Sequence, residues 1–388
     1  MAYSFNINKI LINSLNLLLF TLSVFILILP AISNGYPIIH PDVGTYIASG
    51  FKKFIPIDRP ISYGLFIRLM SLAHSLWLVI IMQSILFVLT LIIIFNYVIK
   101  TNFVMLKVFI TIILLCLTTG LAVYTSVILP DIFSSISILC LIFFITYDKV
   151  PKSIIVFMCI LYIYTNISHL SNFTSSSIIV VSIIILSLLF RKLKQFNLLN
   201  KKLILIVSLI VLCWLIQPLI NYNYSGSFKT YKPTYILVTA NLIQSNILIE
   251  FLEENCDKQE YDLCQYLDEL NGEFKRPPTF VWNHNSPLYK GGCLEKNWTN
   301  CWYEKNEAYK LIILDMFKEP KYIIKLLKNT IKNTSKQLYT INLSTYSPML
   351  KGSAQHFNIG KFFKRELYQY ESAKQSERTL KFKILNKI

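Results

Sequence analysis

Residues 75–98 read SLWLVIIMQSILFVLTLIIIFNYV and contain no charged side chain. A helix needs roughly 20 residues to cross the hydrocarbon core of a bilayer, because each residue advances it by about 1.5 Å. A run this long and this apolar exceeds the length of an ordinary β-strand. The stretch therefore predicts a membrane-spanning helix.

Six further runs share this character, being rich in Ile, Leu, Phe and Val with no acid inside. Together they give seven predicted spans, at about 10–30, 75–98, 103–125, 131–147, 153–170, 174–190 and 203–221. The first run resembles a signal peptide, but its apolar core exceeds the usual 7–15 residues and no convincing small-residue cleavage site is present. The predicted fold class is an α-helical polytopic membrane protein of about seven spans, followed by a mostly helical extracytoplasmic domain.

The charge distribution divides the chain in two. Of the 388 residues 54% are hydrophobic and 15% are charged, against about 25% charged in soluble domains, which argues against a cytosolic protein. Residues 1–221 carry 14 Lys and Arg and four acids, whereas residues 222–388 carry 24 and 17. We expect a transmembrane domain (1–221), an extracytoplasmic domain (222–371) and a loose, basic tail (372–388). The net charge of +17 suits membrane lipid and lipid-linked phosphates better than nucleic acid.

The loop lysines and arginines predict the orientation. With a cytoplasmic N-terminus the inner loops carry ten Lys and Arg, five of them within residues 191–202, and the outer loops carry four. Cytoplasmic loops carry the excess of positive charge, so residues 222–388 are predicted to lie outside the cell membrane. We expect a bacterial inner membrane, since the richness in Ile, Asn, Lys and Tyr suggests an AT-rich genome. A eukaryotic endoplasmic reticulum is the alternative.

Four cysteines fall in the predicted outer domain, and four fall in the spans. The outer ones, Cys256, Cys264, Cys293 and Cys301, form two pairs that are each spaced eight apart. Two local disulfides are the simplest of three connectivities in an oxidising compartment. A zinc site is the alternative, although the spacing is wider than in the usual knuckle.

Helical spacing continues in the outer domain, over residues 234–254, 304–317 and 320–340, whereas residues 275–303 are predicted to be irregular. In 320–340 apolar residues alternate with lysines, and Pro320 is typical of a first helical turn. This basic amphipathic stretch predicts either a helix on an anionic membrane surface or a solvated helix packed on its own domain.

Ionisable groups in the membrane half gather in the predicted outer loops. The first loop, within residues 31–74, contains His40, Asp42, Tyr46, Asp58, Arg59, Tyr63 and Arg68; the next two bring Asp131 and His169. A partly desolvated carboxylate can act as a general base, and arginine can hold a phosphate. Each residue also has a structural interpretation: Asp42 and Asp131 as helix N-caps, Asp58–Arg59 as a local ion pair, and His169 as an interfacial side chain.

The first loop resembles the GT-C class of membrane glycosyltransferases. The resemblance rests on D-x-G-T-Y at Asp42–Tyr46 and R-P-x-x-Y-x-L-F-x-R at Arg59–Arg68, with Asp131 matching a second outer aspartate. It covers about residues 10–220. The class includes protein O-mannosyltransferases and enzymes that modify lipid A or O-antigen, which use polyprenyl-phosphate-linked sugars on the outer face. Members usually have more spans than this chain, which leaves open a short or truncated, inactive variant.

The resemblance implies roles for individual residues. Asp42 would be the general base, and Asp131 would orient the acceptor, help position Asp42 or bind a metal. His40, Tyr46, Tyr63 and His169 would contribute to substrate binding. Arg59, Arg68, Lys52 or Lys53 would stabilise the departing lipid phosphate. Trp282, His284 and Tyr289 would bind the acceptor, unless their loop is only pinned by Cys293–Cys301.

The resemblance also sets the functional alternatives. The leading interpretation is transfer of a sugar from a polyprenyl-phosphate donor to a surface glycan, lipid or protein. No cofactor is certain, and a divalent metal is left open. An O-antigen polymerase or ligase is the second interpretation, and a non-catalytic transport or assembly protein is the third. Transport is disfavoured by unbroken spans that lack midplane charge. Nucleotide-binding, zincin and serine-hydrolase motifs are absent from the sequence.

Overall fold

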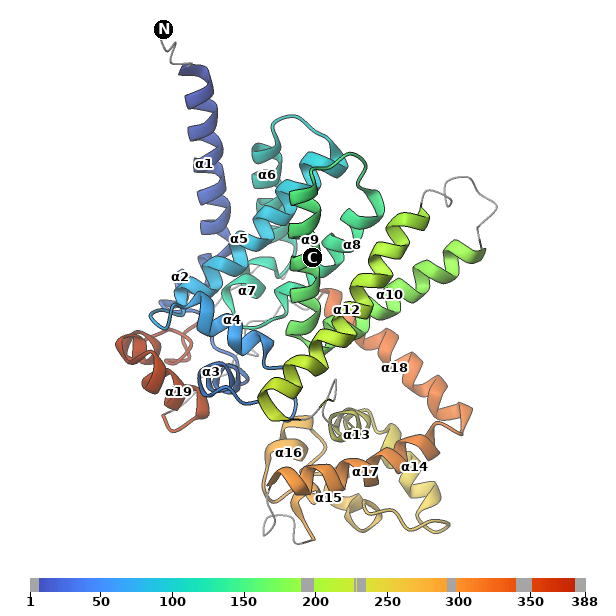
Figure 1. The fold of residues 1–388 in the computed structure, drawn as a ribbon. Helices are drawn as coiled ribbons and strands as arrows, with labels where there is room; N and C mark the ends of the chain where they lie inside the picture. The colour runs from blue at the N-terminus through green and yellow to red at the C-terminus, as the bar shows by residue number, and fades with distance from the viewer. Residues whose placement is uncertain are drawn as a thin grey trace. The chain divides into compact units, whose positions relative to one another are not determined.

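The computed structural model describes residues 7–189, 199–226, 228, 235–291, 298–339 and 351–380 (Figure 1). These residues form helices joined by turns, with one isolated β-bridge. The chain divides into two compact units. The first comprises Met1–Tyr231 together with Ile341–Ile388, and the second comprises Lys232–Thr340.

Seven apolar helices of the first unit coincide with the seven predicted apolar runs. They are α1 (Ile7–Leu27), α5 (Trp77–Ile94, extended by the π-helix Phe95–Ile99), α6 (Val104–Thr118), α8 (Ile132–Thr146), α9 (Lys152–Ser168), α10 (Leu170–Leu189) and α12 (Leu199–Ser225). Three helices, Trp77–Ile99, Leu170–Leu189 and Lys201–Ser225, are long and apolar enough to cross a membrane. The apolar parts of the other four, with Asn13–Leu27 in α1 among them, are 10–17 residues long, so the described residues give three candidate spans, or four with one bent pair in the second unit.

The early end of α6 has a local cause. The predicted run 103–125 is interrupted at Thr119 and Gly120, where α6 ends and the short α7 (Leu121–Ser126) begins. The Thr118 and Thr119 hydroxyls donate to the carbonyls of Leu114 and Leu115 one turn earlier, which competes with continuation of the helix. The helices nevertheless expose large aliphatic side chains, among them Ile160 and Ile178, at levels typical of lipid contact rather than a soluble surface. Membrane association follows.

Three short helices form one end of the first unit: α2 (Leu29–Asn34), α3 (Val43–Lys52) and α4 (Ser62–Met70). The helix α3 begins directly after Asp42. It crosses α4 at two glycines, where a Cβ on Gly50 would lie 1.9 Å from the carbonyl oxygen of Gly64. Only glycine allows this approach of the two backbones. The crossing fixes the segment 53–61 between them.

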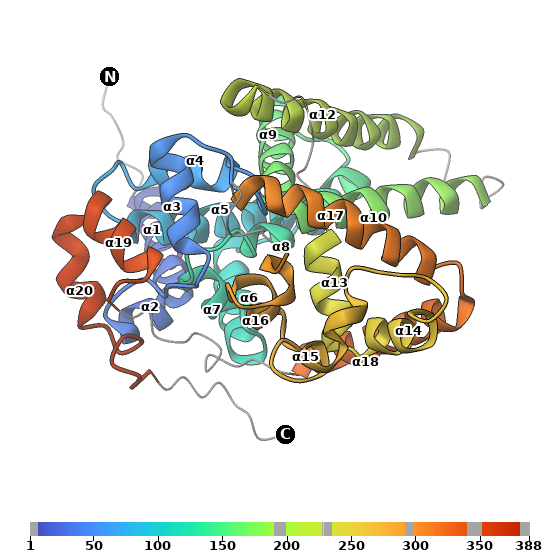
Figure 2. The same cartoon turned by 90° about the horizontal axis from the view of Figure 1, so that it is seen from below.

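The C-terminal segment 351–380 belongs to the first unit, so the structure divides the chain differently from the predicted 222–371 domain and 372–388 tail. Its helix α19 (Ala354–Phe362) packs beside α3 in both views (Figures 1 and 2), and Phe362 stacks on Phe51 with ring centroids 4.6 Å apart. After α20 (Leu367–Glu371), Ala373 and Gln375 are buried. The tail prediction is therefore wrong for residues 372–380, because buried contacts fix a segment that composition marks as solvated.

The second unit contains α13 (Tyr235–Gln244), α14 (Ile247–Asn255), α15 (Leu267–Asn271), α16 (Pro277–Trp282), α17 (Trp298–Met316) and α18 (Pro320–Tyr339). The predicted helix 234–254 is broken at Asn246, whose φ of 63° turns α14 by 92° from α13. Cys256 and Cys264 form a disulfide, as predicted, which removes both from the alternative zinc site. Cys301 is also disulfide-bonded, while Cys293 lies outside the described residues.

Candidate functional site

A parallel β-bridge brings two of the predicted outer loops together. Ile38 pairs with Val127: the Ile38 N–H donates to the Ser126 carbonyl at 3.0 Å, and the Ile128 N–H donates to the Ile38 carbonyl at 3.2 Å. The two paired segments run in the same direction from this bridge. His40 and Asp42 therefore follow on one chain and Asp131 follows on the other, at the start of α8.

Arg59 is the charged centre of this end of the molecule. Its Nε donates to Asp58 Oδ2 at 3.0 Å, and its Nη1 lies 2.9 Å from Asp42 Oδ2. The guanidinium also lies over the Tyr46 ring, 5.0 Å from its centroid. Burial acts to lower the pKa of Arg59, but hydrogen bonding and charge from Asp58, followed by Asp42, raise it overall. Arg59 is therefore a fixed cation that joins the two halves of the first loop.

The two aspartates at helix starts do not act as caps through their side chains. Asp42 precedes α3 and Asp131 precedes α8, yet neither side chain accepts a hydrogen bond from its helix. Asp42 instead contacts Arg59. The N-cap interpretation is wrong for both side chains, whereas the local Asp58–Arg59 pair is present as anticipated. The two carboxylates are thus available for interactions outside their own helices.

The break between α9 and α10 places His169 near Asp131. The Ser134 hydroxyl of α8 donates to Asn172 Oδ1, and Asn172 Nδ2 donates to the Thr165 carbonyl of α9 at 3.0 Å. These bonds tie the start of α8 to this break. Asp131 lies just before α8; burial raises the pKa of its carboxyl, and charge interactions with His169 and His40 lower it less. Asp131 is thus a half-buried carboxylate that is easier to protonate than a free aspartate.

Burial acts on both histidines in the same direction. It lowers the pKa of His40 and of His169 and outweighs the opposing effect of Asp42 on the first and of Asp131 on the second. The Asp42 N–H donates to Nδ1 of His40 at 3.3 Å, and the Ser171 N–H donates to Nδ1 of His169 at 3.2 Å. A neutral histidine whose Nδ1 accepts carries its hydrogen on Nε2. These contacts favour that tautomer in both rings.

The remaining first-loop residues support this cluster or lie away from it. Tyr63 packs edge-on against Tyr46 at 4.9 Å and donates to Gln83 Oε1 at 2.5 Å, and Gln83 donates to the Val127 carbonyl at 3.2 Å. Tyr63 is therefore linked through Gln83 to the Ile38–Val127 bridge. Arg68 points elsewhere: it lies over the Phe51 ring and reaches the Gly50 carbonyl at 3.4 Å. We define His40, Asp42, Asp58, Arg59, Asp131 and His169, with the Tyr46 ring, as the loop cluster.

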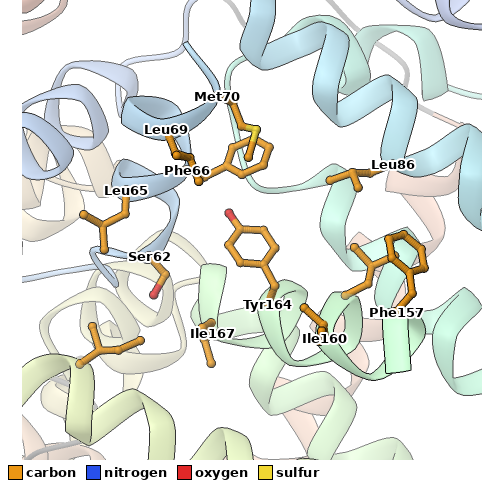
Figure 3. A pocket seen from close by; sticks show the side chains of 12 residues that line it. Ser62, Leu65, Phe66, Leu69, Met70, Leu86, Phe157, Ile160, Tyr164 and Ile167 are labelled. Atoms are coloured by element: carbon orange, nitrogen blue, oxygen red, sulfur yellow. The ribbon is translucent and has the colours of Figure 1, made fainter. Parts of the chain in front are cut away.

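Two apolar cavities lie within the first unit, and one of them is lined in part by a residue of the loop cluster. One, of about 630 Å³, lies among α5, α6, α7 and α8, and Asp131 is one of its lining residues together with Thr119, Tyr124 and Ser134. The other, of about 380 Å³, lies between α4, α5, α9 and α12 (Figure 3). Its lining is almost wholly apolar, with Phe66 of α4 facing Tyr164 of α9. Polar groups thus stand at the rim of lipid-like space.

A set of C-terminal residues, which the sequence did not predict, forms hydrogen bonds to the backbone of the first loop. We call residues 351–380 the strap. Gln375 bonds both ways with Ile39: it accepts from the Ile39 N–H at 2.9 Å and donates to the Ile39 carbonyl at 2.6 Å. Gln355 donates to the Pro41 carbonyl, and Asn358 donates to the Gly44 carbonyl at 3.1 Å. Backbone on both sides of His40 and Asp42 is therefore fixed by strap side chains.

Glu366 supplies a second attachment of the strap. Its Oε2 accepts from the Tyr36 hydroxyl at 2.9 Å and from the Leu76 N–H at 3.1 Å, and its Oε1 accepts from the Ser75 hydroxyl. The contacts join residues about 290 to 330 positions apart in sequence. No local pattern signals such a pairing.

The three acceptor-binding candidates lie in the second unit. Trp282 is 48% exposed and packs near Trp302 at 5.6 Å, and His284 lies 5.5 Å from the Tyr289 ring. Tyr289 is buried and donates to the Val281 carbonyl at 2.7 Å, so it fixes its own loop. Trp282 keeps a surface suited to stacking. The loop cluster belongs to the first unit, and these residues belong to the second.

Within the described ranges, no three His, Cys, Asp or Glu side chains are grouped so as to hold a metal ion. The chain matches no family model, no curated protein and no solved structure. The chemistry of the loop cluster therefore carries the functional argument.

Proposed function

We propose that the chain is an integral-membrane glycosyltransferase of GT-C type, which moves a sugar from a polyprenyl-phosphate donor to a surface glycan, lipid or protein. The observation that carries the proposal is the pairing of the loop cluster with the 630 Å³ cavity, which share Asp131. A polyprenyl-phosphate sugar has the same two parts, an apolar tail and an anionic polar head.

The head group suits the charges of the loop cluster. Arg59 is a permanent cation, and its buried Nη1 lacks a hydrogen-bonded partner within the described residues, although Asp42 lies 2.9 Å from it. A phosphate oxygen would satisfy this N–H and receive the negative charge that develops as the glycosidic bond breaks. His169, whose Nδ1 accepts from the Ser171 N–H, adds a further polar ring at the same rim.

Asp42 and Asp131 are the candidates for the base. Transfer requires removal of a proton from the acceptor hydroxyl as it attacks the sugar. Asp42 is 37% exposed and lies 2.9 Å from Arg59, which leaves it within reach of a substrate hydroxyl. Asp131 has a raised pKa because of burial, which favours holding or relaying a proton. We assign Asp42 as base and Asp131 as its positioning partner on the acceptor side.

A second function draws on a specific observation. His40, His169 and Arg59 gather in one place, as expected for an O-antigen polymerase or ligase that relies on outer histidines and arginines. In such an enzyme Asp42 would only orient Arg59.

One experiment tests both. Membranes containing the wild type or Asp42→Asn are supplied with radiolabelled polyprenyl-phosphate sugars, and transfer to acceptor is followed. The glycosyltransferase predicts transfer that Asp42→Asn abolishes at normal expression, with Asp148→Asn as an unaffected control. Transfer that survives in Asp42→Asn but falls in His169→Ala would favour the second function.

A further inference from the structure

The surface of α18 carries an uncovered apolar stripe. Ile323, Ile324, Leu327 and Ile331 are exposed by 38, 51, 57 and 67%. Their spacing places them on one face of the helix. A different face holds α18 to its unit: Tyr322 is fully buried and packs edge-on against Phe251 of α14 at 5.4 Å. The apolar stripe therefore plays no part in packing the second unit.

Lysines accompany the stripe along α18, and only two of the five pair with acids of α14. The helix carries Lys321, Lys325, Lys328, Lys332 and Lys336, and no Asp or Glu. Lys321 and Lys325 pair with Glu254 and Glu250 of α14. Lys328 and Lys332 make no ion pair with any described residue, and both are exposed. Two exposed lysines thus add positive charge to the helix that carries the apolar stripe.

Covalent connection keeps this helix near the candidate spans. Ser225 ends α12, and Tyr235 begins α13 ten residues later. Even a fully extended linker of this length reaches only about 35 Å. The second unit is therefore tethered close to whatever bilayer α12 enters.

We infer that α18 lies in the interface of an anionic lipid surface, with Ile323, Ile324, Leu327 and Ile331 in the acyl boundary. Interfacial helices bury an apolar face at the headgroup level, while flanking lysines extend their charged ends to lipid phosphates. Of the two interpretations that the sequence left open, the solvated helix would leave four large aliphatic side chains in water. The inference is independent of the proposed enzymatic activity.

The test uses the full chain, with Cys116, Cys140, Cys159 and Cys213 replaced by alanine, in vesicles of phosphatidylglycerol and phosphatidylcholine. A spin label at Leu327→Cys is compared with one at Lys332→Cys for collision with oxygen and with a water-soluble nickel chelate. We expect high oxygen and low nickel collision at 327, and high nickel collision at 332. Replacing phosphatidylglycerol by phosphatidylcholine should raise nickel collision at 327.

Three results would overturn the inference. High nickel collision at 327 in anionic vesicles means that the stripe is solvated. Low collision with both reagents means that protein covers it, either the first unit or a second copy. Identical protection in pure phosphatidylcholine removes the anionic requirement. A matched pair sharpens the charge argument: K328Q/K332Q should raise nickel collision at 327, whereas K321Q/K325Q, whose lysines face acids, should change it less.

Discussion

Arg59 lies with two aspartates at the polar end of the first unit, whereas Lys321 and Lys325 pair with Glu254 and Glu250 on the surface of the second. The Arg59 side chain is 11% exposed, against 46 and 47% for the two lysines. The attraction between opposite charges is much stronger where water is excluded than where water screens the charges. Breaking the buried pairs of Arg59 should therefore cost more stability than breaking the exposed pairs of the second unit.

Removing Arg59 should produce the largest loss of stability. In Arg59→Ala the Asp58 side chain, 9% exposed, is left buried without its cation, which typically costs about 3–5 kcal/mol. Denaturant titration in detergent measures the free energy of unfolding. Arg59→Lys keeps the charge but not the planar guanidinium group, so its loss in the free energy of unfolding should lie between those of the wild type and Arg59→Ala. A loss below about 1 kcal/mol for Arg59→Ala would show that the cluster is effectively solvated.

The Glu366 attachment should come next. Glu366→Ala leaves the Tyr36 hydroxyl and the Leu76 N–H without an acceptor, so we expect a loss of about 1–3 kcal/mol. Glu366→Gln keeps an acceptor oxygen for both and should lose less. Denaturant titration in detergent again measures the free energy of unfolding. Equal losses in the two variants would contradict the hydrogen-bond account.

Asp131→Asn should change stability in the opposite direction. Burial raises the pKa of Asp131 in the native state, so its favourable contribution is complete below the unfolded pKa and is lost as pH rises through the native pKa. The variant should therefore match the wild type in acid and exceed it in Tm at neutral pH, while transfer activity falls. Asp148→Asn, at an exposed pair with Lys100, should show no such pH-dependent difference. A lower Tm for Asp131→Asn at neutral pH would assign the carboxylate a structural role.

The smallest effect belongs to the second unit. Lys325→Ala removes one exposed pair, and the free energy of unfolding should change by less than about 0.5 kcal/mol. The same titration measures it. A loss comparable to that of Arg59→Ala would break the contrast between the two units.

The sequence predicted the positions of the apolar helices because hydrophobicity is a local property. Helix length was harder to predict, because Thr118, Thr119 and Gly120 end α6 early inside an apolar run. The break at Asn246 was missed because neither Gly nor Pro marks it. Number of spans and orientation remain predictions.

Within the candidate site, the gathering of three loops was anticipated from the placement of scarce ionisable residues. Its mechanism was not, since the Ile38–Val127 bridge depends on backbone groups that every residue carries. Arg68 was grouped with the site by its motif, yet it contacts Phe51 and Gly50. The strap escaped notice because Gln355, Gln375 and Glu366 are ordinary polar residues whose partners lie hundreds of positions away.

The strap has a consequence for synthesis. A ribosome delivers residues 34–44 early and residues 351–380 last among the described segments, so the first loop waits for nearly the whole chain before its backbone is fastened. A prematurely terminated product can insert its apolar helices and still lack Gln375 and Glu366. Synthesis through residue 375 thereby becomes a condition for fixing the backbone of the first loop.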